Sequence, residues 1–225
     1  MKIAEIFYSI QGEGTLVGVP SVFVRTSGCN LRCTWCDTPY TSWNPEGEEL
    51  SVEQIVNQVK QFRCSHVVIT GGEPMIVPEI AALTTAIDYA HITIETAGTI
   101  YQRVRCDLMS ISPKLANSTP LTRDGGRWAG QHERLRYQPE VLKHLMAEYR
   151  YQLKFVVASP ADLSEIEKMQ SDLEAPAANI VLMPEGVSRD ALQERGRWLA
   201  EICKEQGYRF SPRLHVELWG DRRGI

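Results

Sequence analysis

The sequence predicts an α/β protein whose strands form an open, partial barrel of six strand–helix units. Six short segments rich in apolar, β-branched residues recur along the chain, and helical patterns separate most of them. Such segments are typical of parallel strands covered on both faces and joined by right-handed crossovers. Because 225 residues and six strands are too few for a closed eight-stranded barrel, we expect an open (β/α)6 relative of the triosephosphate-isomerase (TIM) barrel. The predicted strands are 21–26, 66–70, 92–96, 107–112, 151–158 and 179–183.

Helix signals lie between several of these strands. A helix at 51–62 is indicated by a serine N-cap, with Gln54 three residues later as in a capping box. Residues 164–173 and 188–206 also show helical patterns, and Gly207 is suited to end the second of them.

A polar stretch at 113–139 separates the fourth and fifth predicted strands. Loops of this length are commonly surface insertions or mobile lids. We expect a solvated insertion here. The chain shows no internal repeat, low-complexity tract or linker, and we therefore expect a single domain over residues 1–225.

The composition restricts the classes of function. Lysine and arginine number 24 against 28 aspartates and glutamates, which gives a formal net charge of −4 and a pI near 5.8. A broad nucleic-acid interface needs a basic face, and a membrane span needs about 20 apolar residues. Residues 1–5 also lack the apolar stretch of a signal peptide. We therefore expect a soluble, cytoplasmic protein that binds neither nucleic acid nor membrane.

Three of the six cysteines form one compact motif, Cys29-x3-Cys33-x2-Cys36, directly after the first predicted strand. Three thiolates on a short loop can surround one soft metal centre. A structural zinc site normally has four protein ligands, and no second pair of suitable spacing is present. Three cysteines on a 4Fe–4S cluster instead leave one iron open, as in a catalytic site. The remaining cysteines and three histidines stand in apolar or helical contexts and are interpreted as structural: Cys64, Cys106, Cys203, His66, His91 and His144.

The cysteine spacing, with Trp35 before the last cysteine, resembles the cluster loop of the radical S-adenosylmethionine (SAM) superfamily. Gly71-Gly72-Glu73-Pro74 resembles the motif after the second strand of that superfamily, where two glycines allow a close turn and a carboxylate suits the methionine ammonium. The resemblance implies a radical SAM barrel in which Cys29, Cys33 and Cys36 bind a 4Fe–4S cluster and SAM chelates the fourth iron. The cofactor contacts that it implies are Trp35, Gly71, Gly72, Glu73, Glu95, Ser112, Lys114 and Gln152.

Some of these assignments leave two alternatives open. A glutamate and a lysine in a barrel mouth, such as Glu95 and Lys114, are equally compatible with a structural role. Gln152 and Lys154, on the fifth predicted strand, either face SAM or form a buried structural pair.

The N-terminal part of the chain carries an amide, a carboxylate and a guanidinium. Gln11, Glu13 and Arg25 can together bind a small heterocycle with an amide edge and a carboxylate; otherwise the segment is a solvated, glycine-rich turn between two strands. With Cys36-Asp37-Thr38 and Pro212-Arg213-Leu214-His215, this segment resembles the 7-carboxy-7-deazaguanine synthase family over essentially the whole chain.

That resemblance implies a radical SAM lyase that converts 6-carboxy-5,6,7,8-tetrahydropterin to 7-carboxy-7-deazaguanine, with loss of ammonia, for queuosine or deazapurine biosynthesis. It also implies an electron donor such as flavodoxin, a homodimer, Mg²⁺ at Thr38, and no catalytic side chain, because the radical comes from the cofactor. Residues 1–20 would form a substrate-rim extension and residues 209–225 a segment that closes the pocket. The implied substrate contacts are Ile10, Gln11, Gly12, Glu13, Gly14, Arg25, Thr70, Gly72, His215 and Ile225.

Two other functions remain open from the sequence. A glycyl-radical-enzyme activase would have a broad groove for a protein partner and no small cavity. A non-enzymatic zinc-binding module would contain zinc and no iron.

Overall fold

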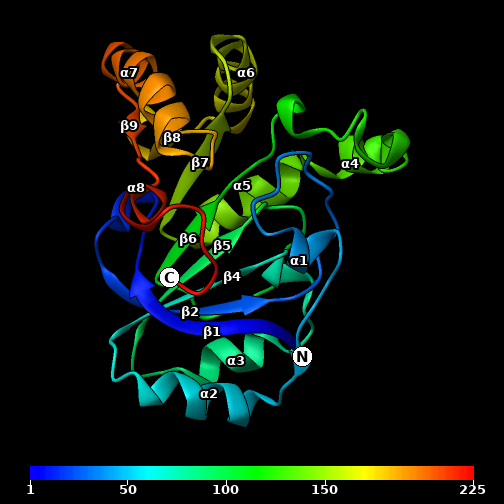
Figure 1. Cartoon of the computed structure of the whole chain (residues 1–225), viewed down its shortest axis with the longest axis vertical. Helices are drawn as coiled ribbons and strands as arrows, with labels where there is room; N and C mark the ends of the chain where they lie inside the picture. Colours follow the sequence, from blue (N-terminus) through cyan, green and yellow to red (C-terminus); the bar gives the residue numbers. More distant parts are fainter.

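The computed structural model describes all 225 residues and contains one nine-stranded sheet in the order β3-β1-β2-β4-β5-β6-β7-β8-β9. Strands β2 and β4 to β9 are parallel, whereas β1 and β3 are antiparallel to their neighbours. The end strands β3 and β9 do not pair with each other, so the barrel is open, as predicted (Figure 1). The strands are β1 Lys2–Ile10, β2 Pro20–Thr26, β3 Glu48–Glu49, β4 His66–Gly71, β5 His91–Thr96, β6 Leu108–Ile111, β7 Tyr151–Val157, β8 Ile180–Pro184 and β9 Arg209–Phe210.

All six predicted strands form, as β2, β4, β5, β6, β7 and β8, within one residue of the expected bounds. Residues 2–10, which belong to the expected substrate-rim extension, form β1, a strand that was not predicted and that extends the sheet beyond β2. Most of its side chains are only half-buried. A strand at this position needs no continuous β-branched run, which explains why the pattern of the buried strands does not reveal it.

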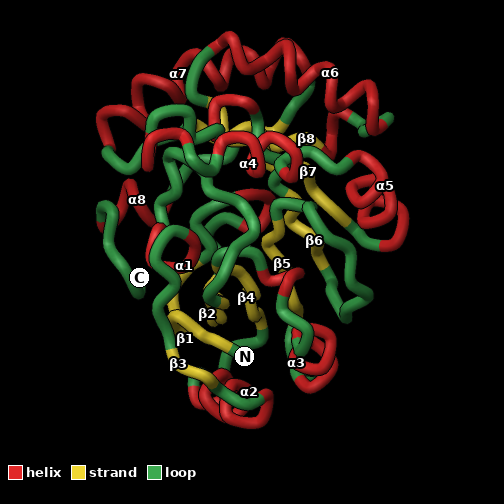
Figure 2. The backbone as a smooth tube through the Cα atoms, turned by 90° about the vertical axis from the view of Figure 1, so that its right-hand side faces the viewer, coloured by secondary structure: helices red, strands yellow, loops and turns green.

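The helices surround the sheet (Figure 2). Ser51 is the N-cap of α2 and forms the predicted capping box, and Gly207 is the C-cap of α7, with the left-handed φ of 69°. No helix combines the length and the apolar composition needed to cross a membrane. The helices are α1 Pro39–Ser42, α2 Val52–Gln61, α3 Ile80–Ala86, α4 Ala129–Leu135, α5 Pro139–Glu148, α6 Leu163–Leu173, α7 Arg189–Gln206 and α8 Leu214–Trp219.

One continuous hydrophobic core lies between the sheet and these helices. Cys203 is buried in it, and Cys64 and Cys106 pack against it, as expected for structural cysteines. The parallel register places Arg25 of β2 beside Thr70 of β4. Because parallel strands end on the same edge of a sheet, this register brings the predicted functional residues to one side of the molecule.

Candidate active site

A cavity of about 520 Å³ lies at the carboxyl ends of the parallel strands. Its wall combines strand ends, the cysteine loop after β2, the N-terminal turn and the last residues of the chain. The structure therefore brings together most of the site residues predicted from the sequence. Those that line the cavity are Ile10, Gln11, Gly12, Glu13, Arg25, Cys29, Cys33, Trp35, Cys36, Thr38, Thr70, Gly71, Gly72, Glu95, Ser112, Lys114, His215 and Ile225.

Three predicted site residues do not line it. Glu73 is fully buried and accepts hydrogen bonds from the backbone N–H groups of Met75 and Ala97, at 3.0 and 2.7 Å. The carboxylate therefore holds its own turn against β5, directly behind the cavity-lining residues Gly71 and Gly72. The close approach of the turn to the cysteine loop explains its second glycine, since a Cβ on Gly72 would lie 2.0 Å from the carbonyl oxygen of Gly28.

The other two residues outside the cavity are Gln152 and Gly14. The Gln152 side chain accepts from the N–H of Thr15 at 2.8 Å and donates to Ser110 Oγ at 2.7 Å, so both ends of its amide are occupied. The N–H of Gly14 donates to Ser211 Oγ at 2.7 Å. The hydrogen-bond partners of Gln152 are thus Thr15 and Ser110 and do not include Lys154.

The cysteine loop presents three free thiols to the cavity. Burial raises the pKa of the Cys33 thiol to about 12, so it stays protonated unless a cation accepts it as a ligand. No three Cys, His, Asp or Glu side chains converge closely enough to hold a single metal ion. All three cysteines nevertheless line the wall of the same cavity. This donor set fits an iron–sulfur cluster with three cysteine ligands.

The segment expected to be a solvated insertion, 113–139, packs against the cysteine loop. The N–H of Thr34 donates to the carbonyl of Ser118 at 2.7 Å, and Trp35 Nε1 donates to the carbonyl of Asn117 at 3.1 Å. His132 of α4 is buried and accepts from the N–H of Arg32 at 3.2 Å, while its Nε2 lies 2.8 Å from Ser118 Oγ. The expectation of a solvated loop was wrong, because buried polar contacts of this segment hold the backbone between the cysteines.

Replacing His132 with alanine should loosen the cysteine loop. The N–H of Arg32 would lose its buried acceptor, at a cost of about 1–3 kcal/mol. We expect hydrogen exchange at residues 29–36 of the metal-free protein to become about tenfold faster. His144→Ala is the matched control, because His144 is exposed, pairs with Glu148 and stacks on Tyr101. Equal protection of the loop in wild type and His132→Ala would contradict this role.

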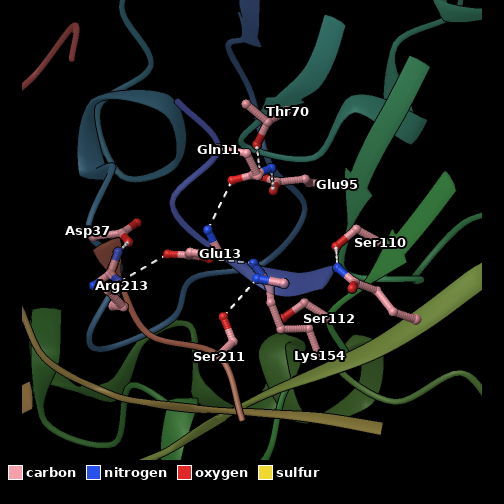
Figure 3. A network of polar contacts seen from close by, with 12 residues as sticks. Gln11, Glu13, Asp37, Thr70, Glu95, Ser110, Ser112, Lys154, Ser211 and Arg213 are labelled. Carbon is pink, nitrogen blue, oxygen red and sulfur yellow. Dashed lines mark hydrogen bonds and ion pairs between the residues drawn. The ribbon is translucent and has the colours of Figure 1, made fainter. Parts of the chain in front are cut away.

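The N-terminal turn is positioned by Glu95 (Figure 3). Gln11 Nε2 donates to Glu95 Oε1 at 3.1 Å, and Thr70 Oγ1 donates to Glu95 Oε2 at 2.9 Å. Glu95 was predicted as a cofactor contact, but its carboxylate is hydrogen-bonded to two of the predicted substrate contacts. The C-terminal segment packs on the same turn, since a Cβ on Gly12 would lie 2.0 Å from His215 Nδ1.

Four charged side chains connect this turn to the rest of the site (Figure 3). Glu13 forms ion pairs with Lys154 of β7 and with Arg213, whose Nε lies 3.0 Å from Glu13 Oε1, and Arg213 also pairs with Asp37. Burial alone would raise the pKa of Glu13, but the charges of Lys154 and Arg213 hold it well below its usual range. The network joins the two chain ends to the cysteine loop. Sequence reasoning missed the part of Arg213 and Asp37 in it, because no local motif links positions so far apart.

The guanidinium of Arg25 has one hydrogen-bond partner in the protein. Its Nε donates to Glu5 Oε1 at 2.6 Å, and this is the only hydrogen bond from its guanidinium. The two terminal amino groups therefore remain for a ligand in the cavity. The last residues pass over the same region: Arg223 stacks 4.0 Å from the ring centroid of Tyr40 and pairs with Glu5.

The chain is similar to known proteins that carry the same kind of site. Residues 23–118 match the Radical SAM superfamily, so the fold and the three-cysteine loop define a radical SAM protein. A 7-carboxy-7-deazaguanine synthase from Halobacterium salinarum is 44% identical and covers 98% of this chain and 91% of its own. Another, from Rhodopirellula baltica, is 44% identical and covers 100% of this chain and 88% of its own. The crystal structure of QueE from Escherichia coli superposes with a TM-score of 0.68 at 26% identity, over 95% of this chain and 94% of that one. The chain therefore belongs to the 7-carboxy-7-deazaguanine synthase family.

Proposed function

We propose that this protein converts 6-carboxy-5,6,7,8-tetrahydropterin to 7-carboxy-7-deazaguanine, with loss of ammonia, in queuosine or deazapurine biosynthesis. One observation carries the proposal. The three-cysteine loop and the side chains of Gln11, Glu13 and Arg25 line the same cavity. The amide, carboxylate and guanidinium of these side chains suit a small carboxylated heterocycle. Family membership supports it, since the relatives are named for the same product. The cavity also argues against an activase that acts on a large protein.

A radical SAM enzyme uses a 4Fe–4S cluster and SAM. When bound, they supply a carbon radical that can remove a hydrogen atom from the substrate. We assign the cluster to Cys29, Cys33 and Cys36, and SAM to the cavity wall formed by Trp35, Gly71, Gly72, Ser112 and Lys114. Lys114 supports this assignment, because its Nζ is tethered to Ser112 Oγ at 2.8 Å and the pair can meet a carboxylate or ribose.

The remaining role of the chain is to place the substrate beside the cofactor and to exclude water. Glu13, kept ionised by Lys154 and Arg213, and Gln11, oriented by Glu95, can accept and donate hydrogen bonds along the amide edge of a pterin. Residues 221–225 line the cavity and can close it over the substrate. Arg25 can bind the substrate carboxylate through its two free amino groups.

We further propose that Mg²⁺ binds at Thr38, whose side chain lies at the cavity wall 3.8 Å from Cys36 Sγ. A small cation that prefers oxygen ligands can be shared between this hydroxyl, water and a substrate carboxylate. The proposal also includes a homodimer, a cytoplasmic location and reduction by a donor such as flavodoxin. These three parts are supported only by membership of the family.

The test of the proposal is anaerobic turnover. The reconstituted, dithionite-reduced protein is incubated with SAM and 6-carboxytetrahydropterin, and the products are identified by mass spectrometry. We expect 7-carboxy-7-deazaguanine to accumulate beyond the amount of SAM consumed, because SAM is regenerated in each cycle. SAM cleavage without any deazapurine, from protein with an intact cluster, would reject this substrate. Zinc in place of iron would favour the binding module instead.

Replacing Arg25 with alanine should impair use of the pterin much more than use of SAM. Loss of a charge-assisted bidentate contact costs about 1.5–3 kcal/mol, so we expect KM for the pterin to rise about 10- to 100-fold. Arg25→Lys, which keeps the charge but not the planar fork, should fall in between. SAM cleavage without substrate, measured on the same samples, should change by less than about twofold. Equal losses in both assays would remove Arg25 from the substrate site.

A further inference from the structure

The outer side of the cysteine loop carries aromatic and arginine side chains that the proposed reaction does not use. Trp43 Nε1 donates to the carbonyl of Cys33 at 3.0 Å. Arg123 lies 4.0 Å from the ring centroid of Trp43, and its Nη1 donates to the carbonyl of Thr34 at 2.9 Å. Neither Trp43 nor Arg123 lines the cavity. Cys33 is buried, whereas Trp43 and Arg123 are half-buried, so they connect the backbone of a proposed cluster ligand to the surface.

The same surface continues over the loop that precedes α4. Arg32 and Arg127 both stack on Trp128, at 4.9 and 5.1 Å from its ring centroid. Leu121, in the same loop, is 73% exposed. We call this surface the arginine face and define it by Arg32, Trp43, Leu121, Arg123, Arg127 and Trp128. In Figure 1 the α4 region projects from the sheet on the side away from α2 and α3.

The charge of this face differs from that of the whole chain. The chain has a formal net charge of −4, yet three arginines cluster here. The acid within the same loop, Asp124, accepts a hydrogen bond from Trp128 Nε1 at 3.2 Å. A basic surface that also exposes an apolar residue is complementary to an acidic protein surface. Electron-transfer encounters need only a small contact area, which a face of this size can supply.

We propose that the arginine face is the docking surface of an acidic one-electron donor protein, which delivers its electron to the cluster past Trp43 and Cys33. This inference rests on the proposed function, because it needs a cluster on the three cysteines. In the step the donor loses one electron and the cluster gains it, and no covalent bond changes. Adjacency to Cys33 favours a redox protein over a nucleic acid, which would need no access to that cysteine.

The test compares protein-driven with chemical reduction. SAM cleavage by the anaerobic holoenzyme is driven either by reduced flavodoxin, as the acidic probe, or by dithionite. Arg127→Glu is the main variant, because the Arg127 side chain stacks on Trp128 and makes no hydrogen bond to the cysteine loop. Lys168→Glu is the matched control: it changes the net charge equally, and its side chain is 71% exposed on α6. A double variant, Arg123→Glu/Arg127→Glu, should lower kcat/KM for flavodoxin further. Its matched control is Lys168→Glu/Lys204→Glu.

We expect kcat/KM for flavodoxin to fall about tenfold in Arg127→Glu at low salt and about 100-fold in the double variant, whereas both controls stay near wild type. The difference should shrink at about 0.5 M salt, where surface charges are screened. Dithionite-driven cleavage should change by less than about twofold in Arg127→Glu. Equal flavodoxin kinetics in Arg127→Glu and Lys168→Glu would overturn the proposal. If dithionite supports no SAM cleavage by wild type, the proposed function fails instead.

Discussion

Replacing Cys33 with alanine should yield a protein that cannot retain an iron–sulfur cluster. Cys33 is the most buried of the three loop thiols, and the loop offers no other side chain to replace it. Two cysteines leave two irons of a 4Fe–4S cluster without protein ligands, and such a cluster is easily lost. We expect iron after anaerobic reconstitution to fall from about four per chain to less than about one. The brown colour and SAM cleavage should be lost with it, as read by absorbance and by a 5′-deoxyadenosine assay.

Cys203→Ala is the matched control for this experiment. Cys203 is also a buried free cysteine, but it packs in the core from α7, far from the cavity wall. Its replacement should lower the free energy of unfolding by about 1 kcal/mol and leave the iron content unchanged. Full iron loading of Cys33→Ala would contradict the assignment of the cluster to this loop.

Replacing Glu13 with alanine should have the largest effect on stability. Lys154 and Arg213 are 5% and 6% exposed, and Glu13 pairs with both. Breaking a buried pair by removing one partner leaves an uncompensated charge, which costs about 3–5 kcal/mol. Arg213 still pairs with Asp37 in the variant, so most of this cost comes from the unpaired charge of Lys154. Lys154 can lose its proton, which lowers the cost. We therefore expect a loss of about 3 kcal/mol in chemical denaturation of the substrate-free protein.

The pH dependence of that loss has a definite sign. The pKa of Glu13 is lowered from 4.5 in the folded protein, so its stabilisation is present at neutral pH and disappears as the pH falls below about 4.5. The difference between wild type and Glu13→Ala should shrink in the same range. Glu201→Ala is the control, because the Glu201–Lys204 pair is exposed and solvent screening leaves it little effect on stability. Similar losses in the two variants would mean that the Glu13 network does not stabilise the fold.

The sequence predicted the parts of this molecule that follow local rules. The six central strands are continuous apolar runs because both of their faces are buried, and the capping box at Ser51 and the glycine at 207 mark helix ends through backbone geometry. The cysteine loop could also be recognised from the sequence, because its three cysteines lie within eight residues. The cysteine loop and the other loops that follow the strands were expected on one edge of the sheet, because the carboxyl ends of parallel strands lie on the same edge.

Other features depend on contacts between distant positions and have no local signal. Glu73 has the residue type and position predicted for a cofactor contact, but nothing in the local sequence shows that its carboxylate accepts hydrogen bonds from the N–H groups of Met75 and Ala97. The composition of the polar stretch at 113–139 predicts a solvated loop, since nothing in it shows that His132 is buried against Arg32. The pairing of Asp37 with Arg213 likewise appears only when the chain ends meet.

The most direct test of the account is the EPR spectrum of the reconstituted, reduced protein before and after SAM is added. If three cysteines hold the cluster and one iron is open to the amino and carboxylate groups of SAM, the signal of the reduced 4Fe–4S cluster should shift when SAM binds. Cys203→Ala should show the same shift. A signal that SAM does not change, or protein that binds zinc and no iron under these conditions, would contradict the assignment on which the proposed reaction depends.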